Sequence, residues 1–150
     1  MLDLSGPLEA FSTANLLAPG SYHFTFMSIE GSSVASSSGL MVSTIPVSST
    51  GLDTFVVVGD PGLSNGPAPQ AAVEFLRDAS ASARRTASVC MGAFLLAQCG
   101  VLDGRTATTH WRWAPLMQER FPAISVAGDR IYVNDGGIWT SAGMSAGIDL

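Results

Sequence analysis

A cysteine at a predicted junction between a strand and a helix is the residue of this sequence best suited to chemistry. The run Thr86–Val89 predicts a short buried strand, and Gly92–Gln98 predicts a short apolar helix. Cys90 lies between them, with Ser88 two residues before it and Gly92 two residues after it. Small residues at these two positions are the steric requirement of a nucleophile elbow, a turn so sharp that larger flanking side chains would collide.

Such a turn would present the Cys90 thiol at the N-terminus of a helix. Exposed N–H groups and the positive end of the helix dipole favour a thiolate there. The sequence therefore predicts a reactive cysteine. The alternative is a buried, inert core thiol, which is the usual state of a free cysteine, and spacing alone does not decide between the two.

Two aromatic residues follow the cysteine at a distance. His110 lies twenty residues after Cys90, and a Cys–His pair is a common way to activate a thiol. A structural histidine between Thr109 and Trp111 is the alternative. Trp111 is a candidate to line a pocket, although tryptophans more often serve as core or interface aromatics.

Strands that alternate with helices would position these residues. The β-branched run Thr54–Val58 is typical of a strand buried on both faces, as in parallel sheets. The further predicted strands are Tyr22–Ile29, Leu40–Ile45, Arg105–Thr109, Ile131–Val133 and Ile138–Ser141. The predicted helices are Ser5–Leu17, Pro69–Ala83, Arg112–Phe121 and one that begins at Gly143. Gly31–Gly39 is predicted to be a Ser-rich loop and Asn134–Gly137 a hairpin turn. This order predicts an α/β three-layer sandwich with a mostly parallel sheet, formed by a single domain over residues 1–150.

Composition narrows the classes of partner. The chain has 150 residues, of which 47% are hydrophobic and 13% charged, whereas ordinary domains carry about 25% charged residues. We therefore expect another subunit or another domain to cover some faces. The net charge is −5 and no basic run occurs, so we expect no nucleic-acid contact from this segment.

The remaining sequence features concern location and cofactors. No apolar run approaches the roughly 18 residues of a membrane span, and the N-terminus lacks the basic start of a secretion signal. Cys90 and Cys99 would lie roughly 13 Å apart on opposite sides of a helix, which disfavours a disulfide and suits a reducing cytoplasm. We expect no metal and no cofactor.

Several ordered segments together resemble a known family. They are Leu2–Glu9, Ser88–Ala97, Gly100–Trp111, Asp129–Val133 and Thr140–Leu150. These segments resemble the amidase-like N-terminal domain of AraC-family (GlxA-type) transcriptional regulators, which belongs to the ThiJ/PfpI, or class I glutamine-amidotransferase-like, superfamily. The isonitrile-hydratase branch shares much of the pattern. The resemblance covers nearly the whole chain and implies a flavodoxin-like fold, here lacking its first strand and its final helix.

The resemblance also implies roles for individual residues. It places Asp3 beside Cys90, where a carboxylate can act as acid and base or hydrogen-bond the thiol; the alternative is an acid that complements a helix dipole. It places the loop of Gly59, Asp60 and Gly62 opposite the cysteine, with backbone N–H groups suited to an oxyanion or a carboxylate ligand; an ordinary turn is the alternative. Enzymatic relatives commonly have Thr after the cysteine, and Met91 removes that hydroxyl.

The function implied by the resemblance is that of a ligand-sensing and dimerisation domain. A small-molecule effector would bind near Cys90, beside Gly59, Asp60, Gly62, Met91 and Trp111, and an attached helix-turn-helix module would contact DNA. One alternative is a cysteine-dependent enzyme of the isonitrile-hydratase type, with Cys90 as nucleophile and Asp3 handling protons. Another is a dimerisation module with a vestigial pocket.

Overall fold

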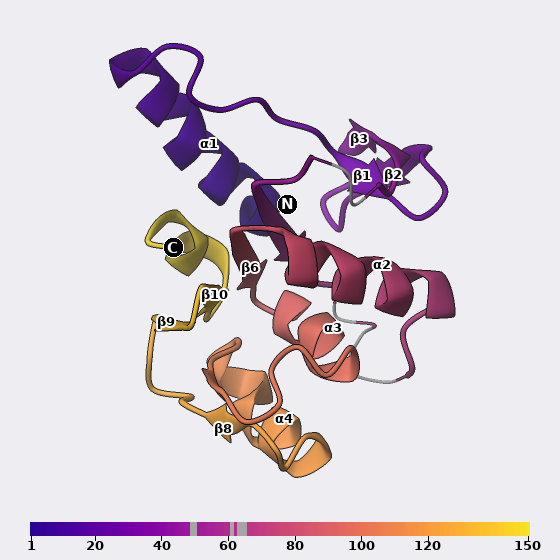
Figure 1. Ribbon diagram of the computed structural model, residues 1–150, viewed down its shortest axis with the longest axis vertical. Coiled ribbons are helices and arrows are strands. Elements are labelled where there is room, and N and C mark those ends of the chain that lie inside the picture. The colour runs from indigo at the N-terminus through magenta and orange to yellow at the C-terminus, as the bar shows by residue number, and fades with distance from the viewer. Residues whose placement is uncertain (49–50, 61, 63–65) are drawn as a thin grey trace.

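A four-stranded sheet forms the centre of the molecule (Figure 1). The computed structural model describes residues 1–48, 51–60, 62 and 66–150. The strand order is β5 (Thr54–Val58), β6 (Arg85–Val89), β10 (Ile138–Ser141) and β9 (Tyr132–Asp135). β5 and β10 both run parallel to β6, and β9 pairs antiparallel with β10. The predicted α/β class with a mostly parallel central sheet is confirmed.

Helical layers cover both faces of this sheet. The helices are α1 (Leu2–Leu17), α2 (Gln70–Ser82), α3 (Gly92–Gln98) and α4 (Ala114–Arg120). Phe55 and Val57 of β5 point into the core with α2 and α3, whereas Val56, between them, faces the side of α1. This alternation follows from the two-residue period of a strand. It places α1 and the C-terminal 3₁₀ helix η3 (Met144–Ile148) on the face opposite α2 and α3.

The segment between α1 and β5 differs from its predicted form. The predicted strand Tyr22–Ile29 shrinks to β1 (Met27–Ser28), which pairs parallel with β4 (Ile45–Pro46). The predicted strand Leu40–Ile45 divides at Thr44, whose hydroxyl forms a hydrogen bond with the Ser28 hydroxyl. The predicted Ser-rich loop contains β2 (Ser33–Ala35), which pairs with β3 (Met41–Ser43) around a Val34–Val42 cross-strand pair.

A cavity of about 810 Å³ separates this segment from the central sheet. Met27 and Ile29 line one side of it, and Phe55 and Val57 of β5 line the other. Among the described residues β5 pairs with β6 alone, so its second edge faces the cavity. The additional strand implied by the resemblance stays a prediction.

The C-terminal third keeps the predicted elements but moves their boundaries. The predicted helix Arg112–Phe121 is a 3₁₀ turn, η2 (Trp111–Trp113), followed by α4, since Pro115 suits only the first turn of a helix. The short strand β7 (Thr106–Ala107) pairs with β8 (Ser125–Val126), which the sequence did not reveal. The β9–β10 turn narrows to Gly136 and Gly137, with φ of 63° and 85°. No helix in the described ranges has the length and apolar character that crossing a membrane requires.

Candidate functional site

Cys90 occupies a strained turn where β6 meets α3. Its φ is +57°, in the left-handed region that non-glycine residues rarely adopt. Both of its backbone polar groups are held: the N–H donates to the Ser141 carbonyl over 3.1 Å, and the carbonyl accepts from the buried Thr109 hydroxyl over 2.7 Å. Strain of this kind costs about 1–3 kcal/mol and persists only where neighbours enforce it. A sharp left-handed turn at this position is what the predicted nucleophile elbow requires.

The neighbours of Cys90 are small because backbone lies against them. A Cβ added to Gly92 would lie 2.1 Å from the Val57 carbonyl oxygen, and a Cβ on Gly59 would lie 2.5 Å from the Met91 nitrogen. Ser88 is fully buried, and its hydroxyl has no hydrogen-bond partner among the described residues. The position of Ser88 therefore requires a small side chain rather than a polar one.

Asp3 lies beside the elbow, at the start of α1. Its Oδ1 accepts a hydrogen bond from the Met144 N–H over 2.8 Å, and its negative charge is near enough to raise the pKa of the Cys90 thiol. The structure thus brings Asp3, near the start of the sequence, close to Cys90, and its hydrogen bond to Met144 adds the start of η3 from the other end of the sequence.

The environment keeps the Cys90 thiol protonated. Burial is the largest cause, and the negative charge of Asp3 is the next; together they raise the pKa of Cys90 to about 11, although the Met91 N–H opposes them. The position of Cys90 at the start of a helix, taken alone, predicts a lowered pKa instead. The helix effect is weak because α3 has only seven residues, whereas burial and a neighbouring carboxylate act directly on the sulfur.

Gly143 borders the sulfur on another side, a role that the sequence analysis did not assign. A Cβ added there would lie 3.1 Å from Cys90 Sγ and 3.0 Å from His110 Cδ2. Met144 follows with φ +48°, so the two non-glycine residues with positive φ in the described chain both lie at this site. Thr109 and Ser141 were also missed. Their signal was present in the segments Gly100–Trp111 and Thr140–Leu150, but nothing local linked either residue to the Cys90 backbone.

His110 lies near the elbow without bonding to it. Its Nδ1 accepts from the Arg112 N–H over 3.3 Å and so caps η2, and its ring stacks on Trp111 at 5.6 Å and 30°. With Nδ1 as acceptor, a neutral His110 carries its proton on Nε2. The hydrogen bonds of Cys90 in the described residues do not include His110. The role of His110 as a base stays a prediction.

The predicted ligand-binding residues lie in different environments. The Met91 side chain is 2% exposed and packs in the core, so only its backbone N–H faces the thiol. Gly59 lies against the elbow, whereas the Asp60 carboxylate accepts from the Gly62 N–H over 2.6 Å within its own loop. Pro61, in the same predicted loop, lies outside the described residues. Trp111 is 69% exposed.

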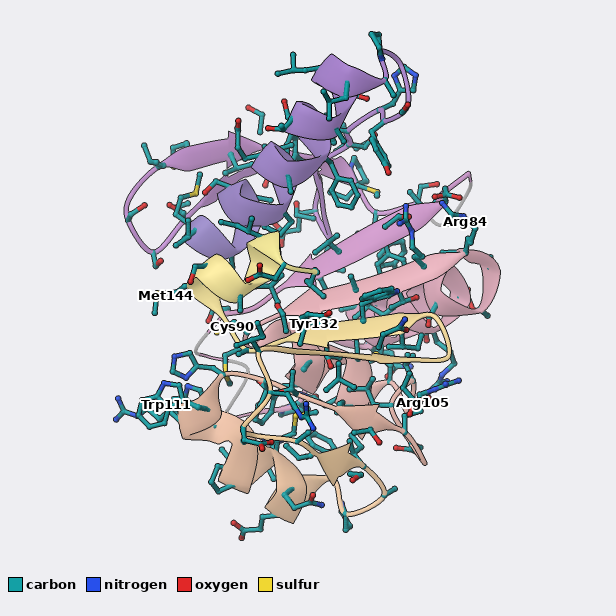
Figure 2. The ribbon with its side chains drawn as sticks, turned by 90° about the vertical axis from the view of Figure 1, so that its left-hand side faces the viewer. Arg84, Cys90, Arg105, Trp111, Tyr132 and Met144 are labelled. Carbon is teal, nitrogen blue, oxygen red and sulfur yellow. The ribbon has the colours of Figure 1, made fainter. Side chains whose placement is uncertain are left out.

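The largest cavities found among the described residues lie away from the Cys90 sulfur. Cys90 is half-buried, and it lines none of the three principal cavities of the described residues, which measure about 810, 430 and 310 Å³. Figure 2 shows Cys90, Met144 and Trp111 on the same side of the molecule. Both cysteines are free thiols. No group of three or more metal-binding side chains occurs in the part of the chain that the structure describes.

Comparison with known proteins gives consistent relatives. The sequence matches the DJ-1/PfpI family over residues 2–150. It is 34% identical to the isonitrile hydratase of Pseudomonas putida, over 99% of this chain and 63% of that protein. It is also 34% identical to the HTH-type transcriptional regulator GlxA of Rhizobium meliloti, over 100% of this chain and 47% of the regulator. The chain thus spans about half to two thirds of the length of these two relatives.

The structural comparison agrees with the sequence comparison. The crystal structure of an AraC family transcriptional regulator from Pseudomonas putida superposes with a TM-score of 0.86 at 25% identity, covering 100% of this chain and 81% of that one. The flavodoxin-like fold implied by the resemblance is thereby confirmed. The chain belongs to the DJ-1/PfpI family.

Proposed function

We propose that this chain is a single domain, residues 1–150, that senses a small molecule for an AraC-type transcriptional regulator. The effector binds at Cys90, on the open side of the elbow, beside Gly59, Gly62 and Trp111. DNA is contacted through an attached helix-turn-helix module, because this chain is acidic, with a net charge of −5. The domain acts in the cytoplasm as a homodimer.

The proposal rests on the half-buried position of the Cys90 thiol near Asp3, which raises the pKa of the thiol to about 11. A pKa of about 11 leaves few thiolates at neutral pH, and the thiolate is the nucleophilic form of cysteine. The buried Met91 side chain offers no hydroxyl next to the sulfur. A site of this kind suits reversible recognition through hydrogen bonds better than covalent turnover.

The test replaces Cys90 by Ala in the complete regulator and measures transcription of the target promoter under conditions that induce it. We expect loss of induction with DNA binding intact, because the effector site and the DNA-binding module are separate. Cys99→Ala is the matched control, since Cys99 is 3% exposed and lies in the core. Normal induction in Cys90→Ala would contradict a sensor centred on this cysteine.

A second candidate function is hydration of an isonitrile. It is favoured by the 34% identity to the isonitrile hydratase, over 99% of this chain, and by the Cys90–Asp3 pair. In this reaction the Cys90 thiolate adds to the electrophilic carbon, Asp3 transfers protons, and water then releases the product. Turnover of an isonitrile that disappears in Cys90→Ser would establish it. Absence of turnover across pH 7–10, where the thiolate fraction increases, would exclude it.

A further inference from the structure

A cavity of about 430 Å³ lies at the end of the central sheet away from Cys90. Thr86, near the start of β6, and Ile138, at the start of β10, both line it. Its other walls come from the end of α2, from the connection between α3 and β7, and from the β9–β10 turn. Three stretches of the chain, residues 77–86, 99–105 and 136–138, therefore meet around one cavity.

Among the described residues, three arginines and no acidic side chain line this cavity. They are Arg77, Arg84 and Arg105, and Figure 2 shows the last two on the side of the molecule away from Cys90. The whole chain has only seven Lys and Arg residues against twelve acids, so nearly half of its cationic side chains gather here. Such a concentration of positive charge in an acidic chain favours an anionic ligand.

Arg84 and Arg105 are held by aspartates that do not line the cavity. Arg84 donates from Nε and Nη2 to the Asp53 carboxylate over 2.8 Å each, and Arg105 donates from Nη1 to the Asp135 carbonyl over 3.2 Å. Nη1 of Arg84 and Nη2 of Arg105 have no partner among the described residues. Both guanidinium groups are thus fixed in place with a donor to spare, and a side chain that is already ordered loses less entropy when a ligand binds.

Arg77 carries a charge that no carboxylate in the described part of the chain pairs with. Its Nε donates to the Cys99 carbonyl over 3.4 Å, which leaves both Nη groups available. These two groups form the planar fork that binds a carboxylate or a phosphate through two parallel hydrogen bonds. Arg77 is therefore the arginine of this cavity best suited to contact an anion directly.

A hydroxyl group and apolar side chains complete the cavity. The Thr86 hydroxyl, in a side chain that is 1% exposed, donates to Ser80 Oγ over 3.1 Å, so the Ser80 hydroxyl keeps its own hydrogen for a ligand. Val101 and Ile138 add apolar surface. The volume falls within the range of about 300–1,000 Å³ that is typical of small-molecule sites, so the cavity has room for a carbon skeleton as well as a charged group.

We propose that this cavity binds a small organic anion through a phosphate or carboxylate group. The charged group accepts from the Arg77 fork and from the Ser80 hydroxyl, which share a face of α2 because they are three residues apart. The carbon part lies against Val101 and Ile138. This site is separate from the proposed effector site at Cys90, and the inference does not rest on it.

Two-dimensional NMR of the isotope-labelled full chain tests the site, with butyl phosphate, valerate and butanol as probes at constant ionic strength. The three probes share a short carbon chain and carry a phosphate, a carboxylate and a neutral hydroxyl. We expect saturable shifts of the Gly136 and Gly137 amides, which line the cavity, with at least one anion and none with butanol. The anion that binds more tightly identifies the charged group. Saturable shifts with neither anion would overturn the proposal.

Variants of Arg77 separate a specific site from attraction by net charge. Arg77→Ala, at an exposed helical position that alanine suits, should raise the Kd of the anion roughly tenfold or more, the effect of losing hydrogen bonds to a charged group. Arg77→Lys keeps the charge without the fork and should weaken binding by less. Arg130→Ala, an exposed arginine that does not line the cavity, is the matched control and should bind as wild type. An unchanged Kd in Arg77→Ala, or an equal increase in Arg130→Ala, would overturn the site.

Discussion

The two ends of the central sheet differ in how they are built. At the carboxyl ends of β6 and β10 lie Cys90 and Met144, both with positive φ. At the opposite end Arg84 pairs with Asp53 over 2.8 Å, and Arg105 lies 3.7 Å from Asp135. Figure 2 shows this separation, with Arg84 and Arg105 on one side and Cys90 and Met144 on the other.

The difference lies in which groups are buried and which are strained. The arginine end holds exposed ion pairs, and its positive φ angles fall on Gly136 and Gly137, where they cost little. The cysteine end places positive φ on residues with side chains. Hydrogen bonds to the Ser141 carbonyl and the Asp3 carboxylate, and one from the Thr109 hydroxyl, hold these residues in place. Strain that the surroundings maintain in this way is one reason for proposing the cysteine end as the functional one.

The largest predicted effect comes from filling the elbow. Gly92→Ala places a Cβ 2.1 Å from the Val57 carbonyl oxygen, so we expect the free energy of unfolding to fall by about 3 kcal/mol. In a helix, alanine normally stabilises by about 1 kcal/mol relative to glycine. A loss of stability in Gly92→Ala would therefore be due to the close contact and not to helix propensity. Urea unfolding measures the change. Gly66→Ala is the control, because no atom of the described residues lies within 4 Å of its added Cβ; equal losses in both variants would contradict the close contact at Gly92.

A pair of buried hydroxyls gives the next effect. Thr109→Val removes the donor to the Cys90 carbonyl and leaves that oxygen unsatisfied, so we expect a loss of about 1–3 kcal/mol in unfolding free energy. Ser88→Ala removes a hydroxyl that is equally buried but has no partner in the described residues, and should leave stability unchanged or higher. If Ser88→Ala proved the more damaging of the two, the hydrogen bonds assigned at the elbow would be wrong.

The smallest predicted effect lies at the opposite end of the sheet. Hydrogen bonds from Arg84 and Thr54 hold the pKa of Asp53 below its ordinary value, but the pair is exposed to solvent and salt screens it. We expect Asp53→Asn to shift the midpoint of urea unfolding by no more than the scatter between repeated measurements, at low and at high salt. A loss as large as that in Thr109→Val would abolish the contrast between the two ends.

Local patterns in the sequence predicted one part of this structure well. The sharp turn at Cys90, β5 and α3 follow from short-range rules: small residues around Cys90, a β-branched run, and an apolar segment ended by Gly100. The hairpin β2–β3 escaped prediction because serine-rich segments favour loops, and pairing across the hairpin decides otherwise.

The site depended on contacts that no local pattern contains. Asp3 and Met144 are 141 positions apart, and their hydrogen bond became visible only in the folded chain. The resemblance predicted Asp3 beside Cys90, but not the segment that Asp3 holds. The direction of the Cys90 pKa shift also depends on burial, which is a property of the fold and not of the helix that follows the cysteine.

The central claim is that burial and Asp3 together keep the Cys90 thiol protonated, and the pH dependence of its alkylation tests this most directly. The rate of iodoacetamide labelling at Cys90, resolved from Cys99 by peptide mass, follows the thiolate fraction. We predict a midpoint near pH 11, and a lower midpoint in Asp3→Asn because the negative charge is removed. A wild-type midpoint at or below the ordinary value of 9.0, or one that Asp3→Asn leaves unchanged, would contradict the account.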